Sequence, residues 1–119
     1  MPEDIEKMIK GICEGFGAGY ELKYNFRYPP TINDDKMVDI LTSSAKKELG
    51  DDGVLTSEAS MGGDDFAYFS QKVPGVYFNL GSGNEEKGIT EPLHSSSFDI
   101  DEDCLKYGIA VLTSFVLNQ

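Results

Sequence analysis

His94, the sole histidine of the chain, is the residue whose type and position best suit chemistry. It ends a glycine-spaced acidic loop over residues 81–94, which connects an apolar run to a sequence typical of a helix start. Imidazole is the commonest metal ligand in proteins and titrates nearest neutral pH, so a lone copy on a loop is a functional candidate. Taken alone the signal is weak, because most single surface histidines are simply solvated.

A pair of glycines in Met61-Gly-Gly-Asp-Asp-Phe66 forms a second candidate site. Gly62 and Gly63 precede a short expected helix, where exposed backbone N–H groups at the positive end would suit a carboxylate. The competing interpretation is that the glycines only form a turn while Asp64 or Asp65 caps the helix, since aspartate is a good N-cap whatever the function. The residues alone leave both interpretations open.

The serines after His94 do not indicate a nucleophile. Residues 95–97 are adjacent to the imidazole in sequence, but sequence neighbours seldom form a working Ser–His pair. The chain also has no G-x-S-x-G motif. We therefore expect no catalytic residue of the serine-hydrolase type.

The elements that must position these candidates begin with a helix and a strand. Pro2 at a tolerated first-turn position and two following acids favour a helix start. One face of that helix is apolar, formed by Ile5, Met8, Ile9, Ile12 and Phe16. Residues 20–28 then alternate apolar, mostly aromatic, side chains with polar ones, which predicts a long half-buried strand ended by two prolines. The chain offers this strand no local antiparallel partner.

The remainder reads as two longer helices joined by short elements. The first of these helices should be capped by Asn33 or Asp34 and run to about Leu49. Short strands are expected over 54–58 and 75–80, with a short helix over 64–71 between them. A capping signature over 99–102 predicts the final helix, with an apolar stripe of Leu105, Ile109, Leu112 and Val116.

Composition excludes several classes of partner. The chain has 119 residues with 21 acidic and 10 basic side chains, a formal charge of −11, so it should repel phosphate backbones and anionic membrane surfaces. We therefore expect neither a nucleic acid nor a membrane as partner. Its two cysteines form no paired framework, which favours a reduced, cytoplasmic setting.

Four motifs occur in one order and together resemble a known family. They are Ser60-Met-Gly-Gly-Asp-Asp-Phe-Ala-Tyr-Phe69, Val73-Pro-Gly-Val-Tyr-Phe78, the glycine-spaced loop over 81–88, and Pro92-Leu-His-Ser-Ser-Ser-Phe-Asp-Ile-Asp-Glu-Asp103. The chain resembles the C-terminal portion of the dinuclear-metal aminoacylases and carboxypeptidases. This group includes amidohydrolases, hippurate hydrolases, N-acetyl-diaminopimelate deacetylases and indoleacetyl-amino-acid hydrolases.

The resemblance implies an α/β fold in two parts. Residues 1–28 would be a helix and a strand at the end of a ferredoxin-like lid or dimerisation domain. Residues 29–119 would be the C-terminal part of a three-layer α/β catalytic domain. The prolines at 29 and 30 would mark the passage between the domains. An ordinary surface turn there is the alternative that the residues leave open.

The resemblance also implies metal-dependent cleavage of the amide bond of N-acyl amino acids or peptides. Two divalent ions, zinc, manganese or cobalt, would activate a bridging water and polarise the carbonyl. His94 matches the family's last metal ligand, and Gly62 and Gly63 would lie on the side of the substrate carboxylate. The other metal donors and the general base belong to segments that precede the lid in the family. We therefore expect no catalytic residue in this chain, no stable metal site and no activity for the chain alone.

An interpretation of a different class is a non-catalytic, acidic module that self-associates. Its basis is the strand expected over 20–28, because exposed strand edges pair with other chains.

Overall fold

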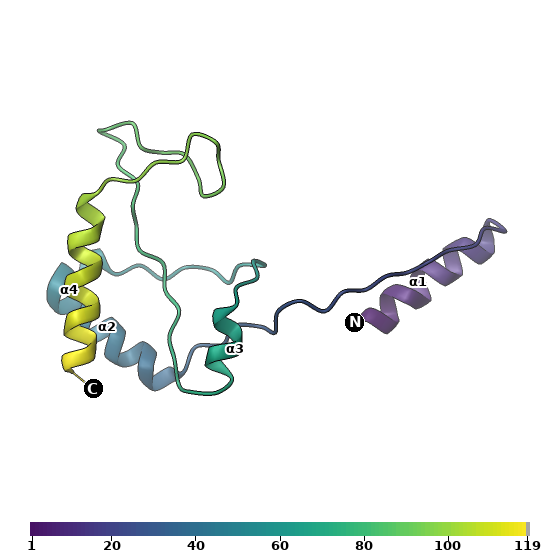
Figure 1. Ribbon diagram of the computed structural model, residues 1–119, viewed down its shortest axis with the longest axis horizontal. Coiled ribbons are helices and arrows are strands. Elements are labelled where there is room, and N and C mark those ends of the chain that lie inside the picture. Colours follow the sequence, from purple (N-terminus) through teal and green to yellow (C-terminus); the bar gives the residue numbers. More distant parts are fainter. Residues whose placement is uncertain (119) are drawn as a thin grey trace.

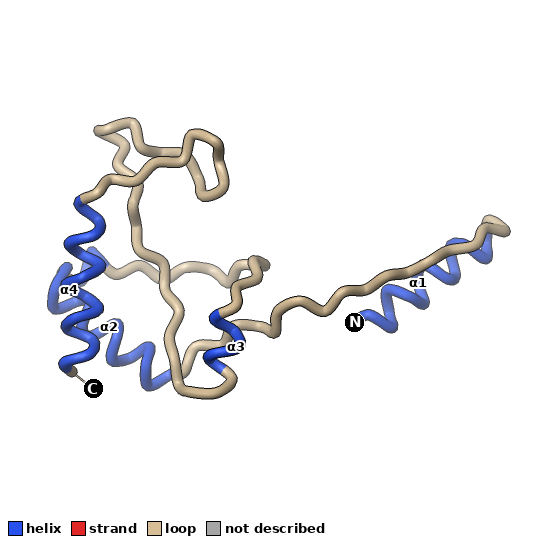
Figure 2. The backbone as a smooth tube through the Cα atoms, viewed as in Figure 1, coloured by secondary structure: helices blue, strands red, loops and turns tan. Residues whose placement is uncertain are grey.

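Helices and loops make up the structure, a computed structural model that describes residues 1–118. In chain order the elements are α1 (Pro2–Gly15), α2 (Asp35–Leu49), the single 3-10 turn η1 (Asp51–Gly53), α3 (Phe66–Ser70) and α4 (Asp103–Leu117), as Figure 1 shows. No β-strand occurs within residues 1–118 (Figure 2), where the sole β-type pairing is a bridge between Asn84 and Ile89. The expected α/β fold, a partial three-layer sheet domain with a ferredoxin-like helix–strand unit, is therefore wrong for this structure.

The expected strands fail because none of them finds a partner. Residues 20–28 are extended, but none of their backbone groups makes a backbone–backbone hydrogen bond within residues 1–118. A helix satisfies its own N–H and C=O groups, whereas a strand depends on a neighbouring strand for every one. Two prolines and α2 separate this segment from the later extended runs at 54–58 and 75–80, which are also without strand structure.

The first two helices form where the sequence predicts them. α1 has Pro2 in its first turn, with Glu3 and Asp4 beside it near the positive end of the helix dipole. Asp34 caps α2, because its carboxylate accepts the N–H of Met37 at 3.1 Å. Gly50 follows α2 with a φ of 79°, a left-handed conformation that favours glycine over other residues.

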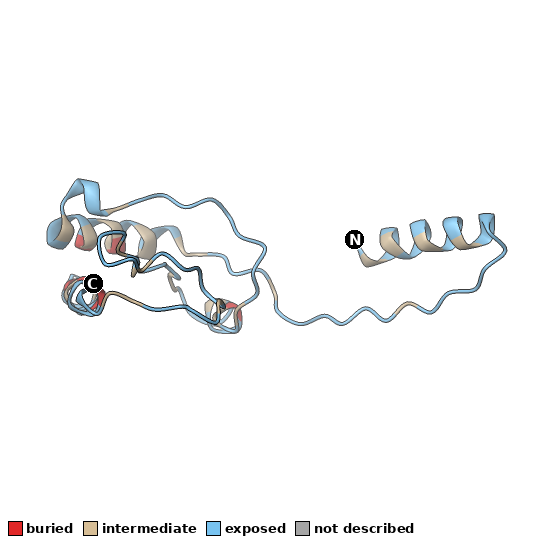
Figure 3. Ribbon diagram, turned by 90° about the horizontal axis from the view of Figure 1, so that it is seen from above, coloured by how far each residue is buried: buried red, intermediate tan, exposed pale blue. Residues whose placement is uncertain are grey.

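The core lies between α2 and α4, the only two α-helices in residues 1–118 that pack on each other. Leu41 and Ser44 of α2 are buried there, facing Cys104, Val111 and Ser114 of α4. Figure 3 shows buried stretches on both of these helices. Leu80 approaches α4 at Gly108 so closely that an added Cβ would lie 2.8 Å from its Cδ2 atom.

The buried face of α4 differs from the apolar stripe predicted by periodicity. The four predicted residues are exposed, at 53%, 68%, 48% and 66% for Leu105, Ile109, Leu112 and Val116. α4 is apolar around most of its circumference, so periodicity does not single out one face. Contact with α2 determines which face is buried.

None of the helices within residues 1–118 is long and apolar enough to cross a membrane.

The N-terminal part projects from the α2–α4 pair. Within the described chain α1 packs on no other helix, and the chain after it doubles back along its side (Figure 1). The radius of gyration is 20.5 Å, against about 13–14 Å for a compact domain of this length. The projecting part therefore accounts for the elongated shape, 62 Å along its longest axis.

Candidate functional site

His94 occupies a tight turn after the glycine-spaced loop. The turn is closed by the Ser95 N–H, which donates to the Pro92 carbonyl at 3.2 Å. His94 has a φ of 67°, and within residues 1–118 it is the sole non-glycine residue with a positive φ. Left-handed backbone is uncommon for a residue with a side chain and often marks a functional position. His94 is exposed, so its imidazole is accessible to ligands.

The residues after His94 reinforce the turn. Ser95 donates its hydroxyl to the Glu91 carboxylate at 3.2 Å, and its oxygen accepts the Ser97 N–H, also at 3.2 Å. The Ser95 carbonyl also accepts the Phe98 N–H. Ser95 thus has a structural part in the turn.

The loop that leads to His94 is tied to the start of α4. Asn84 and Ile89 exchange two backbone hydrogen bonds of 2.8 Å, which makes a small hairpin-like loop with Gly88 in a left-handed conformation. The Asn84 amide donates to Asp101 at 2.6 Å, and the Lys87 ammonium donates to the other Asp101 oxygen at 2.7 Å. This clamp holds both ends of the segment that contains His94.

Asp101 is the electrostatic centre of this clamp. Its side chain is 14% exposed, and the hydrogen bond from Lys87, followed by that from Asn84, lowers the Asp101 pKa from 3.8 to about 2. The Asp101 carboxylate also accepts the N–H of Asp103 at 3.3 Å. The capping arrangement expected over residues 99–102 does not form, because α4 has Glu102 at its N-cap with no side-chain cap hydrogen bond, and the Asp99 carboxylate accepts the neighbouring Ile100 N–H instead. Asp103 has a lowered pKa as well, chiefly through its hydrogen bond from Lys106.

The glycine turn is packed against the N-terminal part of the chain. A Cβ atom on Gly63 would lie 3.0 Å from the Tyr28 ring, whereas one on Gly62 would meet only the Ser60 hydroxyl at 3.4 Å. The Gly62 N–H itself donates to that hydroxyl at 3.4 Å. Asp64 accepts the Phe66 N–H at 2.8 Å, so a side-chain carboxylate already satisfies one donor at the start of α3. This favours the capping interpretation for Asp64.

Tyr77 connects this turn to the start of α2. Its hydroxyl donates to Asp64 at 3.3 Å, and the negative charge of Asp64 raises the Tyr77 pKa. Asn33 pairs with the Tyr77 backbone in both directions, donating to its carbonyl at 2.9 Å and accepting its N–H at 2.8 Å. The Asn33 side chain thereby pairs with the backbone of one residue in the run over 75–80, as a neighbouring strand would.

The two candidate positions are not brought together. Figure 1 shows the loop that contains His94 at one end of α4, away from α3 and the glycine turn before it. Within residues 1–118, no group of three or more histidine, cysteine or acidic residues could hold a metal ion. One imidazole cannot supply the several donors that each divalent ion requires. The described residues therefore do not by themselves fit a two-ion centre.

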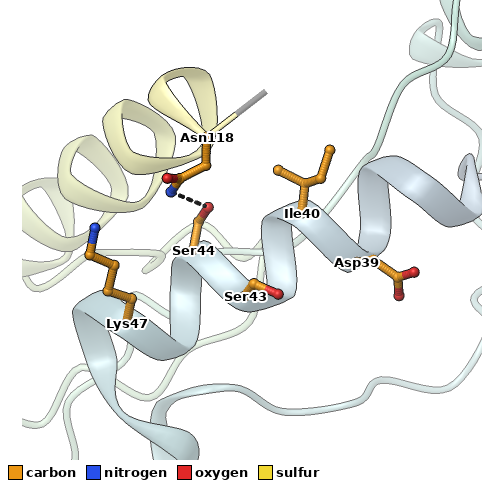
Figure 4. A pocket seen from close by; sticks show the side chains of 6 residues that line it. All are labelled: Asp39, Ile40, Ser43, Ser44, Lys47 and Asn118. Atoms are coloured by element: carbon orange, nitrogen blue, oxygen red, sulfur yellow. Dashed lines mark hydrogen bonds between the residues drawn. The ribbon is translucent and has the colours of Figure 1, made fainter.

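A shallow pocket lies elsewhere, between α2 and the end of α4, with a volume of about 440 Å³. Figure 4 shows Asn118 turned toward Ser44, whose hydroxyl accepts its amide at 3.3 Å. Asp39, Ile40, Ser43 and Lys47 complete the lining. None of the candidate site residues lines this pocket. Its hydrogen bonds instead join the two helices.

Comparison with known proteins decides the family. The sequence pattern of Peptidase family M20/M25/M40 matches residues 3–118. The chain belongs to this family. Membership confirms the resemblance that the motifs around His94 suggested. The M20 family is one of metallopeptidases, so its enzymes use divalent metal ions.

Three relatives of this M20 chain show how much of an enzyme it represents. It is 39% identical over 109 residues to thermostable carboxypeptidase 1 of Saccharolobus solfataricus, covering 87% of this chain and 26% of the relative. It is 34% identical to the N-acetylcysteine deacetylase of Bacillus subtilis, covering 88% and 26%. It is 28% identical to the N-acetyldiaminopimelate deacetylase of Exiguobacterium sibiricum, covering 97% and 29%. The M20 chain thus spans less than a third of the length of these relatives. No solved structure matches it.

Several residues that organise this M20 chain were not recognised from the sequence as part of a site. The sequence pattern places Asp101 only in a helix-capping signature, whereas in the structure its carboxylate accepts hydrogen bonds from Asn84 and Lys87 across the loop. The sequence predicts Asn33 as one of two candidate helix caps, but its side chain forms hydrogen bonds with the Tyr77 backbone instead. These pairs are 14 to 44 residues apart, so no local pattern could have joined them.

Proposed function

We propose that this chain is part of a metal-dependent hydrolase that cleaves the amide bond of N-acyl amino acids or peptides. The observation that carries the proposal is the family match over residues 3–118, together with relatives named as a carboxypeptidase and deacetylases. All of these names describe cleavage of an amide bond. The acyl group and the amino acid are left general, because substrate choice depends on a pocket to which this chain supplies only part of the wall.

His94 is the proposed metal ligand. Its exposure, its place on a clamped loop and its left-handed backbone all favour a side chain held out for binding. A pair of zinc, manganese or cobalt ions would supply an activated water and a polarised carbonyl. Because the described residues include no further cluster of donors, the remaining ligands and the general base would come from other polypeptide segments of the enzyme.

Gly62 and Gly63 are the proposed substrate-side residues. The Gly62 N–H donates only a long hydrogen bond of 3.4 Å to the exposed Ser60 hydroxyl, which a substrate carboxylate would replace. Gly63 allows the turn to lie against Tyr28. Asp64 already occupies the Phe66 N–H at the start of α3, so the proposed carboxylate contact is with the glycine turn before that helix.

The proposed division places residues 1–28 in a lid domain and residues 29–119 in the catalytic domain. Its support is the projection of α1 and the extended segment away from the α2–α4 pair (Figure 1). Both cysteines are free, and we place the protein in a reducing compartment such as the cytoplasm.

Assay of the pure chain tests the metal part of this proposal. With zinc, manganese or cobalt added in turn, we expect no hydrolysis of an N-acetyl amino acid above the metal-only background. Equilibrium dialysis should find at most weak binding, abolished by His94→Ala. Metal-dependent hydrolysis by the pure chain would contradict the proposal that other segments supply the missing donors.

A chimera tests whether the chain belongs in a hydrolase. The aligned C-terminal part of the Bacillus subtilis N-acetylcysteine deacetylase would be replaced by this chain, to which it is 34% identical over 105 residues. We expect metal-dependent deacetylation, lost by at least about 100-fold in His94→Ala. Glu86→Ala in the exposed loop tip is the matched control and should retain activity. A folded, metal-loaded chimera that retains activity in His94→Ala would contradict the role proposed for His94.

A further inference from the structure

The segment that contains His94 forms a closed loop whose two ends meet just before α4. The Ser82 carbonyl accepts the Asp101 N–H at 2.8 Å, which joins the ends through the backbone. Figure 1 shows this loop beyond the N-terminal end of α4. No helix or strand lies between Ser82 and Asp101. The shape of the loop therefore depends on its turns and on its side chains.

The loop has two parts, a hairpin-like part over residues 84–89 and the His94 turn over residues 91–98. The two backbone hydrogen bonds between Asn84 and Ile89 close the first part, and the contacts of Ser95 close the second. Within residues 1–118, no hydrogen bond or ion pair joins the two parts directly. Both parts instead reach Asp101, the first through side chains and the second along the chain. Asp101 therefore fixes where the His94 turn lies relative to the hairpin-like part.

Lys87 supplies the positive charge that Asp101 requires. Its ammonium donates to Asp101 at 2.7 Å and lies 3.6 Å from the Asp103 carboxylate. Without Lys87, the Asp101 carboxylate, which is only 14% exposed, would have no cation partner within residues 1–118 and would lie beside the negative charge of Asp103. Lys87 is also the one basic residue over 84–103, among the acidic residues Glu85, Glu86, Glu91, Asp99, Asp101, Glu102 and Asp103.

The His94 turn needs support from outside, because its own hydrogen bonds are long. The Ser95 N–H bond to the Pro92 carbonyl and the Phe98 N–H bond to the Ser95 carbonyl are both 3.2 Å, at the long end of the usual range. The His94 φ of 67° is unfavourable for a residue with a Cβ atom and persists where the surrounding structure holds it. The clamp at Asp101 supplies that support.

We propose that Lys87 is a positioning residue for His94. Its ion pair with Asp101 holds the hairpin-like part against the start of α4, which keeps the His94 turn in its left-handed conformation and the imidazole in one orientation. Lys87 acts through the turn and not by contact with the imidazole. The functional consequence rests on the proposed role of His94 as a metal ligand, whereas the effect on the turn is a property of this chain alone.

NMR spectroscopy of the full chain tests the effect on the turn. His94 is the sole histidine, so its imidazole gives a single set of signals. We expect a backbone order parameter of about 0.85 at His94 in wild type and, in Lys87→Met, a value below about 0.6 with averaged imidazole signals. Lys87→Arg keeps the cation and should retain the wild-type values. Lys106→Met is the matched control, because it removes an equal charge from Asp103 at a position outside the loop.

A double-mutant cycle tests whether Lys87 acts through Asp101. Asp101→Asn alone should loosen His94, and the addition of Lys87→Met should change little more, because the effects of residues in one network do not add. An unchanged order parameter at His94 in Lys87→Met would overturn the proposal, as would additive effects or an equal effect of Lys106→Met. Circular dichroism checks the helices of each variant, and Lys87→Gln replaces Lys87→Met in the comparison if the latter loses them.

Zinc affinity tests the functional consequence in the chimera with the N-acetylcysteine deacetylase. By equilibrium dialysis, Lys87→Met should raise the free zinc concentration at half occupancy by about 10-fold, whereas Lys87→Arg and Lys106→Met should not. Weaker zinc binding in His94→Ala but not in Lys87→Met would overturn the positioning role. No effect of His94→Ala would contradict the proposed function instead, and the NMR spectra of the chain would still decide whether Lys87 holds the turn.

Discussion

Lys87 and Asp101 are joined by a hydrogen bond of 2.7 Å between the ammonium and the carboxylate, which ties the tip of a loop to the residue two positions before α4. Asn84 donates to the same carboxylate from the base of that loop. The pair lies on either side of His94 in sequence. The position of His94 therefore depends on the Lys87–Asp101 ion pair, although neither residue of the pair belongs to the turn that contains His94.

The first prediction concerns the pH dependence of this clamp. The Asp101 pKa is about 2 in the folded chain against an ordinary value of 3.8. Stability from a lowered pKa is present above the ordinary value and is lost as the pH falls from about 4 toward 2. Asp101→Asn should therefore lower the melting temperature at pH 6 and reduce the further loss between pH 4 and pH 2. Circular dichroism melts of both proteins over this range measure the difference. An equal loss in the two would contradict the role of Asp101.

The second prediction concerns which face of α4 is buried. Val111 is 3% exposed, and its neighbour Leu112 is 48% exposed. Val111→Ala should cost about 1–3 kcal/mol of unfolding free energy, because a buried side chain is lost from a small core. Leu112→Ala should change stability by less than about 0.5 kcal/mol, although it removes more atoms. Urea unfolding of both variants distinguishes them, and the reverse order would favour the stripe predicted by periodicity.

The third prediction concerns the backbone at His94. Its φ of 67° is accessible to glycine without steric cost and is unfavourable for a β-branched residue. His94→Gly should keep the unfolding free energy within about 1 kcal/mol of wild type, and His94→Val should cost about 1–2 kcal/mol more. Denaturant unfolding measures both. Equal stability of the two variants would show that this turn does not require left-handed backbone.

The fourth prediction concerns the contact between Tyr68 and Arg27. Tyr68→Phe removes one hydrogen bond and keeps the ring, which costs about 0.5–1.5 kcal/mol. Trypsin should then cleave after Arg27 about 2- to 10-fold faster, because the cleavable state is more populated. Cleavage after Lys23, which lies outside the contact, is the internal control. A rate increase at both residues would indicate general loosening rather than loss of this contact.

Much of the helical structure could be predicted because its causes are local. Asp34 caps α2 through a donor three residues away, and Gly50 follows it with the backbone that ends such a helix. The expected strands had no comparable local cause. Each needed a partner, and the run over 75–80 obtained only the side chain of Asn33. The candidate site was partly foreseeable: His94 was found by its residue type, whereas Asp101 and Lys87 meet only when the loop folds back.

The sequence by itself determined the family, the positions of the helices and the residue types that could bind a metal, because these depend on motifs and on contacts within a few residues. Only the tertiary structure decided that Val111 rather than Leu112 is buried, that residues 20–28 have no strand partner within the described chain, and that Asp101 clamps the loop before His94. Each of these depends on groups distant in the chain that meet in space, and spacing along the sequence does not encode such meetings.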